Sequence, residues 1–474
     1  MKRVLILFVA LWCFTSASSA QPASRKGSLS LALPDAADLQ EQRYQNSIRL
    51  STKLLCSGVF VSGRDPSRVI EDDLYWSEHY FFDWETTATE IDQANKTVRL
   101  RAPSTSNPSS EIRATAIFQE GYGCTLLPEQ ATRLPIEREK RKSFAKRALA
   151  ESRDANRPSV EAVLDRAFTE TPGKPLQRTR AILVLKGGEI IAERYADGFD
   201  KATPMLGWSM GKSVAAIVFG AYAKKTGLDI DKPTSINEWQ RATDTRSAIT
   251  PRHLLNMAGG LRFHNPGTND NTYYTDLHDH ESVYFRPQNI EQLVVHQPLK
   301  YRPGRFFSYR NTNTLGLLAL VRQSLLAQNV ISFADEAVFE KIGADTMTLE
   351  TDLYGNPIMT GFVYGTPRDW AKLGLLVLND GKIEGERILP RGWRDDVLMK
   401  PSKAFDGYGG QLWLNRRQGF KSLPKDAGYF LGWGSQVVII IPSMDLVIVR
   451  MGLSDDDFVS YFDSVLSQLL DVIG

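Results

Sequence analysis

Ser209 and Lys212 are the residues of this chain whose types and spacing are best suited to joint chemistry. They lie in the run Trp-Ser-Met-Gly-Lys-Ser (residues 208–213), at the start of a long apolar segment. Residues three apart on a helix share one face, so a helix that opens at Ser209 places its hydroxyl beside the ammonium group. In a partly dry site that ammonium can lose its proton and activate the hydroxyl as a nucleophile. The backbone N–H of Ser209 would then be a free donor at a helix N-terminus, suited to holding an oxyanion.

The spacing alone is not specific, because Ser-x-x-Lys occurs twice more in the chain. The run 143–146 lies in a charge-rich segment typical of a solvent-exposed helix face, and the run 422–425 contains Pro424, which excludes an ordinary helical turn. Only Ser209 opens an apolar segment that must be buried. The alternative interpretation of this serine is a helix N-cap followed by an exposed lysine.

Tyr309 and Asn311 form a second motif, Tyr-x-Asn, about a hundred residues after the serine. A phenol at this place can share a proton with the serine and the lysine, acting first as a base and then as an acid. Asn311 could orient the lysine or the carbonyl of a substrate. The same motif occurs at residues 44–46, but only Tyr309 follows a Pro-Gly turn and an aromatic run and precedes an apolar helix, predicted over residues 315–325.

The elements that must position these residues indicate an α+β fold. In the first part of the chain, helical periodicity over residues 35–54 stops near Gly58, and a hairpin (86–102) and a strand (112–119) follow. The remaining part is predicted to contain strands at 180–185, 190–195, 436–441 and 445–449, a helix from Ser209 to near Gly227, and helices at 160–168 and 457–470. Strands at both ends of this part, with helices between and outside them, predict one antiparallel sheet covered by helices.

The first twenty residues have the pattern of a secretory signal peptide. A basic start precedes an apolar run over residues 4–14, and small residues lead to Ala20. That run is shorter than an ordinary membrane span, so we expect cleavage after Ala20, with a retained anchor as the alternative, and no later membrane span. The mature protein is then periplasmic or secreted. Loss of Lys2 and Arg3 takes the formal charge from +2 to about zero, which gives no general attraction for nucleic acid.

Cleavage leaves two cysteines, Cys56 and Cys124, which we expect to pair in an oxidising compartment. A thiol catalyst is the rival interpretation, but neither cysteine has a histidine or a cationic run near it in sequence. The predicted organisation is therefore a disulfide-stapled N-terminal α+β region over residues 35–134, a linker over 135–158, and a catalytic domain over 159–474.

The third of these parts, the predicted catalytic domain, resembles a known family. Residues from about 160 to 474 are similar to the serine β-lactamase and penicillin-binding superfamily, in particular to its class C-like branch of esterases and 6-aminohexanoate-dimer hydrolases. In that branch Trp-Ser-Met-x-Lys-Ser opens the active-site helix and Tyr-x-Asn follows about a hundred residues later, as in this chain. The segments 366–374, 388–393 and 432–452 also fit.

The resemblance implies a β-lactamase/transpeptidase-like fold, with an antiparallel sheet flanked by helices and a helical subdomain. It also implies that Ser209 is the nucleophile, with Lys212 and Tyr309 as proton-transfer groups and Asn311 as the matching asparagine.

The third motif of this superfamily, Lys-Thr-Gly or His-Thr-Gly on a late strand, has no match where it is expected. The Lys-Thr-Gly at residues 225–227 comes shortly after the serine, where its glycine is better placed to end the helix. The late strand instead offers residues 426–428 or 433–435, and the sequence does not choose between them. A backbone N–H of this strand should supply the second oxyanion donor, with Trp433 and Gly434 as candidates. The missing cation weakens the case for a β-lactam or peptide carboxylate, although Lys425 could partly replace it.

Other patterns suggest other sites. Gly-x-Ser-x-Gly at residues 207–211 fits the nucleophile elbow of α/β-hydrolases, but that fold needs a late histidine and the last one is His296. The run His-Asp-His-Glu at 278–281 suggests a metal, yet no further ligands match it. Four aromatic residues could line an acyl pocket or simply belong to the core: Trp208, Tyr273, Tyr274 and Trp433.

The sequence thus predicts a secreted serine hydrolase that cleaves a small-molecule ester or amide through a Ser209 acyl-enzyme, with no cofactor, metal or nucleic-acid partner. Two alternatives stay open. One is a β-lactamase or D-alanyl-D-alanine carboxypeptidase-type enzyme that recognises penicillin. The other is a non-catalytic protein that binds cell-wall peptides on the same fold. The oligomeric state is not indicated.

Overall fold

The computed structural model describes residues 36–74, 84–107, 109–131, 133–135, 144–145, 147–152, 157–173, 175–263, 283–325, 328–454 and 458–474. The predicted signal peptide lies outside these residues, as does much of the expected linker. In the part of the chain that is described, no helix is long and apolar enough to span a membrane.

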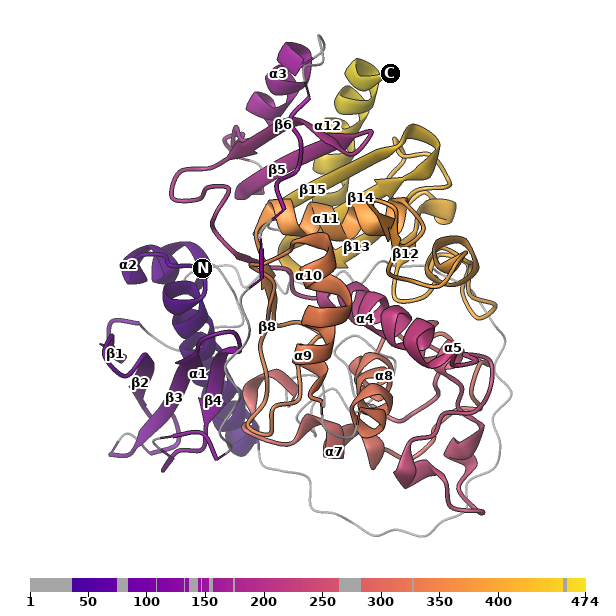
Figure 1. The fold of residues 1–474 in the computed structure, drawn as a ribbon. Coiled ribbons are helices and arrows are strands. Elements are labelled where there is room, and N and C mark those ends of the chain that lie inside the picture. The colour runs from indigo at the N-terminus through magenta and orange to yellow at the C-terminus, as the bar shows by residue number, and fades with distance from the viewer. Residues whose placement is uncertain are drawn as a thin grey trace.

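The centre of the molecule is a six-stranded antiparallel sheet with the order β12-β13-β14-β15-β5-β6 (Figure 1). Its strands are β5 (Thr179–Lys186), β6 (Glu189–Tyr195), β12 (Trp413–Leu414), β13 (Gly428–Gly432), β14 (Gln436–Ile441) and β15 (Leu446–Gly452). Strand β15 pairs with β5 from Leu446 opposite Lys186 to Gly452 opposite Thr179. Strands from the two ends of the catalytic part thus lie side by side, which confirms the predicted antiparallel sheet.

Helices cover both faces of this sheet because its strand residues alternate between two cores. Ile182 and Val184 pack with α3 (Arg157–Ala167) and α12 (Phe458–Ile473), whereas Leu183 and Leu185 belong to the core on the opposite face. Helix α11 (Pro367–Leu378) lies on that second face and packs closely on it. An added Cβ at Gly374 of α11 would come within 2.7 Å of a Val447 methyl, so a larger residue there would push the helix off the sheet.

Helix α4 (Met210–Thr226) runs between the sheet and a helical layer (Figure 1). That layer contains α5 (Pro251–Leu255), α7 (Ile290–Val295), α8 (Asn311–Ser324), α9 (Val330–Ala334) and α10 (Glu340–Ile342). Helix α4 is buried over its first fourteen residues and ends at Gly227, which adopts a left-handed conformation with φ 67°. The Lys-Thr-Gly at residues 225–227 is therefore a helix terminus, as expected.

A small sheet, β7-β9-β8, carries the chain into α4. Its strands are β7 (Met205–Leu206), β8 (Thr348–Leu349) and β9 (Val363–Gly365). Because β7 pairs with β9, the residues just before Ser209 are fixed to a segment more than 150 residues later in the sequence.

The N-terminal region consists of α1 (Ala36–Phe60), the short helix α2 (Pro66–Val69) and a four-stranded antiparallel sheet. The strands of this sheet are β1 (Ala88–Asp92), β2 (Thr97–Pro103), β3 (Glu111–Gln119) and β4 (Gly123–Leu127). Helix α1 packs across β2, β3 and β4, and a disulfide between Cys56 and Cys124 joins it to β4. The helix ends at Phe60, near Gly58 as predicted. Gly58 packs closely on Val69: a Cβ on Gly58 would lie 2.6 Å from a methyl group of Val69.

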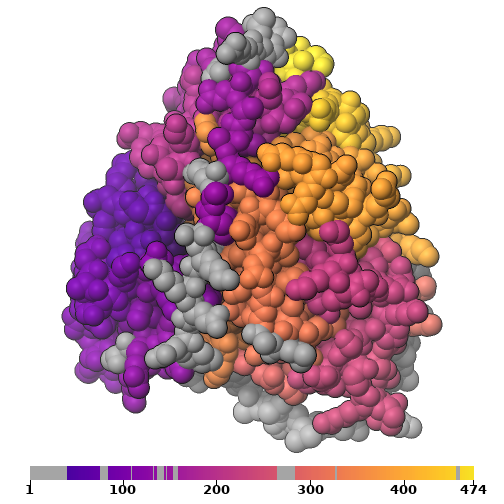
Figure 2. Space-filling model, in the orientation of Figure 1, coloured from indigo at the N-terminus to yellow at the C-terminus, as the bar shows by residue number. Residues whose placement is uncertain are grey.

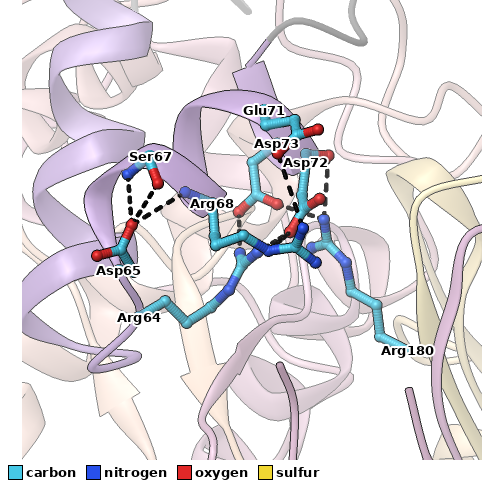
Figure 3. Close-up of polar contacts among 8 residues, drawn as sticks. All are labelled: Arg64, Asp65, Ser67, Arg68, Glu71, Asp72, Asp73 and Arg180. Carbon is cyan, nitrogen blue, oxygen red and sulfur yellow. Dashed lines mark hydrogen bonds and ion pairs between the residues drawn. The ribbon is translucent and has the colours of Figure 1, made fainter. Parts of the chain in front are cut away.

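The N-terminal region lies against one flank of the catalytic part (Figures 1 and 2). One link is a cluster of ion pairs in which Arg64 and Arg180 of β5 converge on Asp73 (Figure 3). Arg64 also pairs with Asp72 at 2.7 Å. The two guanidinium groups lie on the ring of Phe199, at 4.4 Å and 4.9 Å from its centroid, so each arginine is both paired and packed.

Candidate active site

Ser209 is the residue immediately before α4, and its own backbone is already helical, with φ −61° and ψ −8°. The N–H groups of Met210, Gly211 and Lys212 bond to the carbonyls three residues earlier, at 2.9–3.1 Å. Within the described residues no backbone carbonyl accepts the N–H of Ser209 itself. This N–H is thus available at the start of a long buried helix, where it can face an oxyanion.

The turn into Ser209 is strained. Trp208 has a positive φ of 48°, which a bulky residue rarely adopts. The preceding Gly207 is anchored by a 2.8 Å hydrogen bond from its N–H to the carbonyl of Val363 in β9. A Cβ at Gly207 would lie 2.3 Å from the ring of Trp370, so the surroundings fix this turn tightly. Such strain next to a candidate nucleophile is typical of functional sites.

Lys212 is buried one helical turn after Ser209 and points at it. Its Nζ lies 3.0 Å from Ser209 Oγ and donates to the carbonyl oxygen of Thr360 at 2.8 Å. Burial lowers the pKa of Lys212 to about 7, because the charged form loses its hydration. At neutral pH about half of the molecules then carry a neutral amine, which can accept the proton of Ser209.

Tyr309 completes the cluster from the segment just before α8. Its phenol hydrogen-bonds to the side chain of Ser209, and its ring centroid lies 4.9 Å from Lys212 Nζ. Burial raises the pKa of Tyr309 to about 12, opposed by the hydrogen bond to Ser209. The rings of Tyr408 and Trp413 flank it at 6.0 Å and 5.4 Å. The three residues predicted to work together are therefore in mutual contact.

Asn311 lies behind this cluster. It is buried at the start of α8 and donates from Nδ2 to the phenol oxygen of Tyr284 at 3.1 Å. Tyr284 in turn hydrogen-bonds to the side chain of Thr360, whose carbonyl holds Lys212. A chain of hydrogen bonds thus runs from Asn311 through Tyr284 to Thr360, the residue that holds the lysine. Sequence reasoning missed Tyr284 and Thr360, because neither belongs to a motif and both come from segments remote from the serine.

Trp433 and Gly434 lie at the end of β13 that meets the turn before Ser209. A Cβ at Gly432 would come within 2.1 Å of the Gly207 carbonyl oxygen, and the ring of Trp433 contacts that of Trp208 at 5.2 Å. Residues 426–428 lie at the opposite end of β13, roughly 13 Å away at the usual rise per strand residue. Of the two candidate segments, the structure brings the one at 433–435 close to the turn that precedes Ser209.

Strand β13 carries no cation next to this end. It reads Gly-Tyr-Phe-Leu-Gly, and Lys425 is an exposed residue beyond its other end. Lys425 therefore does not take the place of the lysine of the third motif.

A pocket of about 570 Å³, counted with the part open to solvent, lies between the N-terminal region and the catalytic part. Leu54 and Gly58 of α1 contribute one wall, and Trp208, the residue before Ser209, and Trp433 also line the pocket. Arg64, Asp73 and Arg180 of the ion-pair cluster in Figure 3 lie in the same lining. Tyr273 and Tyr274, the other aromatic candidates for an acyl pocket, lie outside the described residues.

The described residues contain no group of three or more side chains suited to hold a metal ion. The run at 278–281 lies outside them. Cys56 and Cys124 are both engaged in the disulfide, which removes the thiol-catalyst interpretation.

The fold places the protein in the β-lactamase and transpeptidase class, in which a sheet built from both ends of the domain packs on a buried helix that begins at a serine. The comparison with family models agrees: the model described as Beta-lactamase matches residues 164–457, and the chain belongs to this family. The resemblance predicted from the motifs is thereby confirmed.

Individual relatives are distant. The 6-aminohexanoate-dimer hydrolase of Paenarthrobacter ureafaciens is 25% identical over 260 residues, which is 54% of this chain and 64% of that protein. The chain thus matches a little under two thirds of the length of this relative.

Among solved structures, a putative 6-aminohexanoate-dimer hydrolase from Bacillus anthracis is 20% identical, with a TM-score of 0.52 over 70% of this chain and 87% of that one. A family VIII carboxylesterase is 14% identical, with a TM-score of 0.53 over 69% and 99% of the two chains. These structures show the shared fold.

Proposed function

We propose that this protein is a serine hydrolase that cleaves an ester or an amide through an acyl-enzyme on Ser209. The observation that carries the proposal is the contact between Ser209 Oγ and a buried lysine whose pKa burial lowers to about 7. A lysine with an ordinary pKa would be protonated and could not accept the proton of the serine.

In the proposed acylation step, Ser209 Oγ attacks the substrate carbonyl carbon while the neutral Lys212 takes up the hydroxyl proton. The negative charge that develops on the carbonyl oxygen faces the N–H of Ser209 and a backbone N–H at the 433–435 end of β13. Tyr309 passes a proton to the leaving alcohol or amine and regains one from Lys212. The C–O or C–N bond breaks, and the acyl group stays on Ser209.

In deacylation a water molecule attacks the acyl carbon, and the same groups work in reverse order. The phenol of Tyr309 takes a proton from the water while it passes its own proton to the neutral Lys212, and Lys212 then returns a proton to Ser209 Oγ as the acid leaves. The high pKa of Tyr309 suits this role, because the phenol stays protonated near neutral pH and exchanges protons only with a partner in contact.

We favour an ester or amide over a β-lactam because β13 lacks a cation for a substrate carboxylate. The 6-aminohexanoate-dimer hydrolase and the family VIII carboxylesterase that the chain resembles bear names of amide and ester hydrolases, which supports the same substrate classes. The rings of Trp208, the residue before Ser209, and Trp433, which contact each other, are proposed to receive the acyl group.

We also propose export to the periplasm or the medium, with the domain division at residues 35–134, 135–158 and 159–474. The supporting observations are the disulfide, which persists in oxidising compartments, and the signal-like first twenty residues.

The test is hydrolysis of a chromogenic short-chain ester by the wild-type protein and by Ser209→Ala. We expect turnover by the wild type and none above background by the variant. Turnover that survives in Ser209→Ala would disprove the nucleophile. Fast nitrocefin hydrolysis would favour the β-lactamase alternative, and binding of cell-wall peptides without any acylation would favour a non-catalytic protein.

A further inference from the structure

A buried ion pair connects the N-terminal region to the catalytic part at a second place, apart from the cluster in Figure 3. Lys53 of α1 lies 2.7 Å from the carboxylate of Glu350, and the two side chains are 1% and 0% exposed. Glu350 directly follows β8, in the catalytic part. A buried ion pair is weak evidence for stability, since the cost of removing two charges from water offsets their attraction. The contribution of this ion pair therefore lies in the backbone segment that it holds in place.

The N-terminal region surrounds the Glu350 carboxylate with donors. Besides Lys53, the hydroxyl of Ser57 donates to it at 2.6 Å and the backbone N–H of Cys124 at 2.8 Å. Lys53 also donates to the Cys124 carbonyl. The Cys56–Cys124 disulfide joins α1 and β4, the two elements that supply these donors. The fit is close: a Cβ on Gly123, which has φ +65°, would lie 2.6 Å from Glu350 Cγ.

The backbone of Glu350 holds the turn that supports Lys212. Its N–H donates to the Phe362 carbonyl at 3.0 Å, and its carbonyl accepts from the Ile358 N–H at 2.7 Å. Thr360, whose carbonyl accepts the Lys212 bond, lies between these two anchor points.

The same turn packs tightly on the start of α4. A Cβ at Gly211 would lie 2.6 Å from the Met359 carbonyl oxygen. A small displacement of residues 358–362 therefore has to move either the carbonyl that holds Lys212 or the helix that carries it.

Phe362, at the end of the turn, makes a second connection. Its ring lies 4.5 Å from Lys53 Nζ on one side and contacts the rings of Trp208 and Tyr284 at 5.6 Å and 5.5 Å. One ring thus touches the N-terminal ion pair, the strained residue before Ser209 and the tyrosine next to Thr360.

We propose that Glu350 is a positioning residue for catalysis, and that the N-terminal region, through Lys53, Ser57 and the backbone of Cys124, fixes the 358–362 turn that holds Lys212. This inference rests on the proposed function of Ser209 and Lys212. The N-terminal region thus serves as a support of the catalytic base, and the disulfide preserves that support.

The groups around Lys212 indicate that Glu350 acts on it through the position of the 358–362 turn and not through its charge. The titratable groups that face it are Tyr309 on the α8 side and, through Thr360, Tyr284; the Lys53–Glu350 pair lies beyond the turn. The low pKa of Lys212 comes from burial, with no contribution from a nearby charge. Loosening the turn would admit water to the ammonium group, which stabilises its charged form, so the lysine would titrate at higher pH.

The test compares four variants of the full chain by the rate at which a fluorophosphonate labels the enzyme between pH 5 and 10. Glu350→Gln keeps the shape of the side chain and removes the charge. Lys53→Met with Glu350→Leu removes both charges, which leaves no unpaired buried ion. Ser57→Ala removes the hydroxyl that contacts the Glu350 carboxylate and the Lys53 carbonyl, but no charge, and is the mild variant. Glu41→Gln is the control, because Glu41 holds Ser104 and Thr105 within the N-terminal region only.

We expect Glu350→Gln and the double variant to label about ten- to a hundredfold more slowly at pH 7, with the midpoint of the pH profile at higher pH. Ser57→Ala should show a smaller change in the same direction, and it decides the matter if Glu350→Gln fails to fold. Glu41→Gln should label as the wild type does. The proposal is overturned if the folded double variant, or Ser57→Ala where Glu350 variants do not fold, keeps the wild-type rate and midpoint. It is also overturned if Glu41→Gln reproduces the loss.

Loss of labelling in Ser209→Ala is measured in parallel. If that variant still labels, the proposed function fails, whatever the Glu350 variants show.

Discussion

The pH dependence of acylation should report the titration of Lys212. Burial lowers the pKa of this lysine to about 7, whereas an ordinary lysine titrates near about 10.4. At pH 7 about half of the Lys212 amines are therefore neutral, compared with roughly one in 2,500 for an exposed lysine. The burial of one side chain thus supplies about a thousandfold more of the base form at neutral pH.

The expected profile of kcat/KM is a single rise with unit slope below pH 7 and a plateau from about pH 8 to 10. No falling limb is expected in this range, because the pKa of Tyr309 is raised to about 12. Lys212→Arg should remove the rise and lower the plateau about 10²- to 10⁴-fold, since a guanidinium stays protonated at every accessible pH.

The assay is stopped-flow hydrolysis of a 4-nitrophenyl ester, followed at a wavelength where the phenol and phenolate absorb equally. The spontaneous hydrolysis rate is subtracted at each pH. A profile that is flat from pH 5 to 9, or a Lys212→Arg variant that keeps the wild-type profile, would refute Lys212 as the proton acceptor.

Three further predictions follow from the geometry. Lys212→Met should be inactive yet more stable by about 5 kcal/mol at pH 6.5. The folded pKa of Lys212, about 7, lies well below the unfolded value of about 10.4, so nearly the full cost of burying the charged lysine applies below pH 7. The gain should shrink as the pH rises toward 10; urea unfolding measures it, and a destabilised variant would contradict it. Gly432→Ala should reduce activity at least about tenfold, because its Cβ would lie 2.1 Å from the Gly207 carbonyl oxygen, in the turn that leads into Ser209; unchanged ester turnover would contradict this close approach. Removing the Cys56–Cys124 disulfide, which closes a loop with a sequence separation of 68, should lower the free energy of unfolding by about 4 kcal/mol. Urea titration with and without reductant measures this loss, and equal midpoints would contradict it.

The fold was predictable in its regular parts because its strands and helices carry clear periodicity. The hairpin around residues 93–96, the pair β14 and β15 and the final helix were all found from alternating or helical patterns. The end of α1 near Gly58 was also found, although the close packing of this glycine against Val69 could not be predicted from the sequence.

The residues of the candidate site were predictable only where they belong to a sequence motif. Ser209, Lys212 and Tyr309 stand out by type and spacing, and the structure brings them into contact. Thr360 holds Lys212 only through its backbone carbonyl, which any residue type could supply, so the sequence does not indicate its role. Glu350 gives no signal either, because a single acidic residue in a loop is usually solvent-exposed and only the folded N-terminal region makes it a buried anchor.

The choice between the two ends of β13 also needed three dimensions. Both candidate segments contain glycine and lie within ten residues of each other, so sequence patterns cannot separate them. Only the pairing of β13 in the sheet, and the contact of Gly432 with Gly207, shows which end meets the serine.

The central claim is that Ser209 carries the acyl group. The most direct measurement is mass spectrometry of the protein after brief reaction with a fluorophosphonate or a slowly hydrolysed ester, followed by peptide mapping. We predict one adduct, on the peptide that contains Ser209, and no adduct in Ser209→Ala. An adduct on another residue, or unmodified wild-type protein that still turns over ester, would contradict the account.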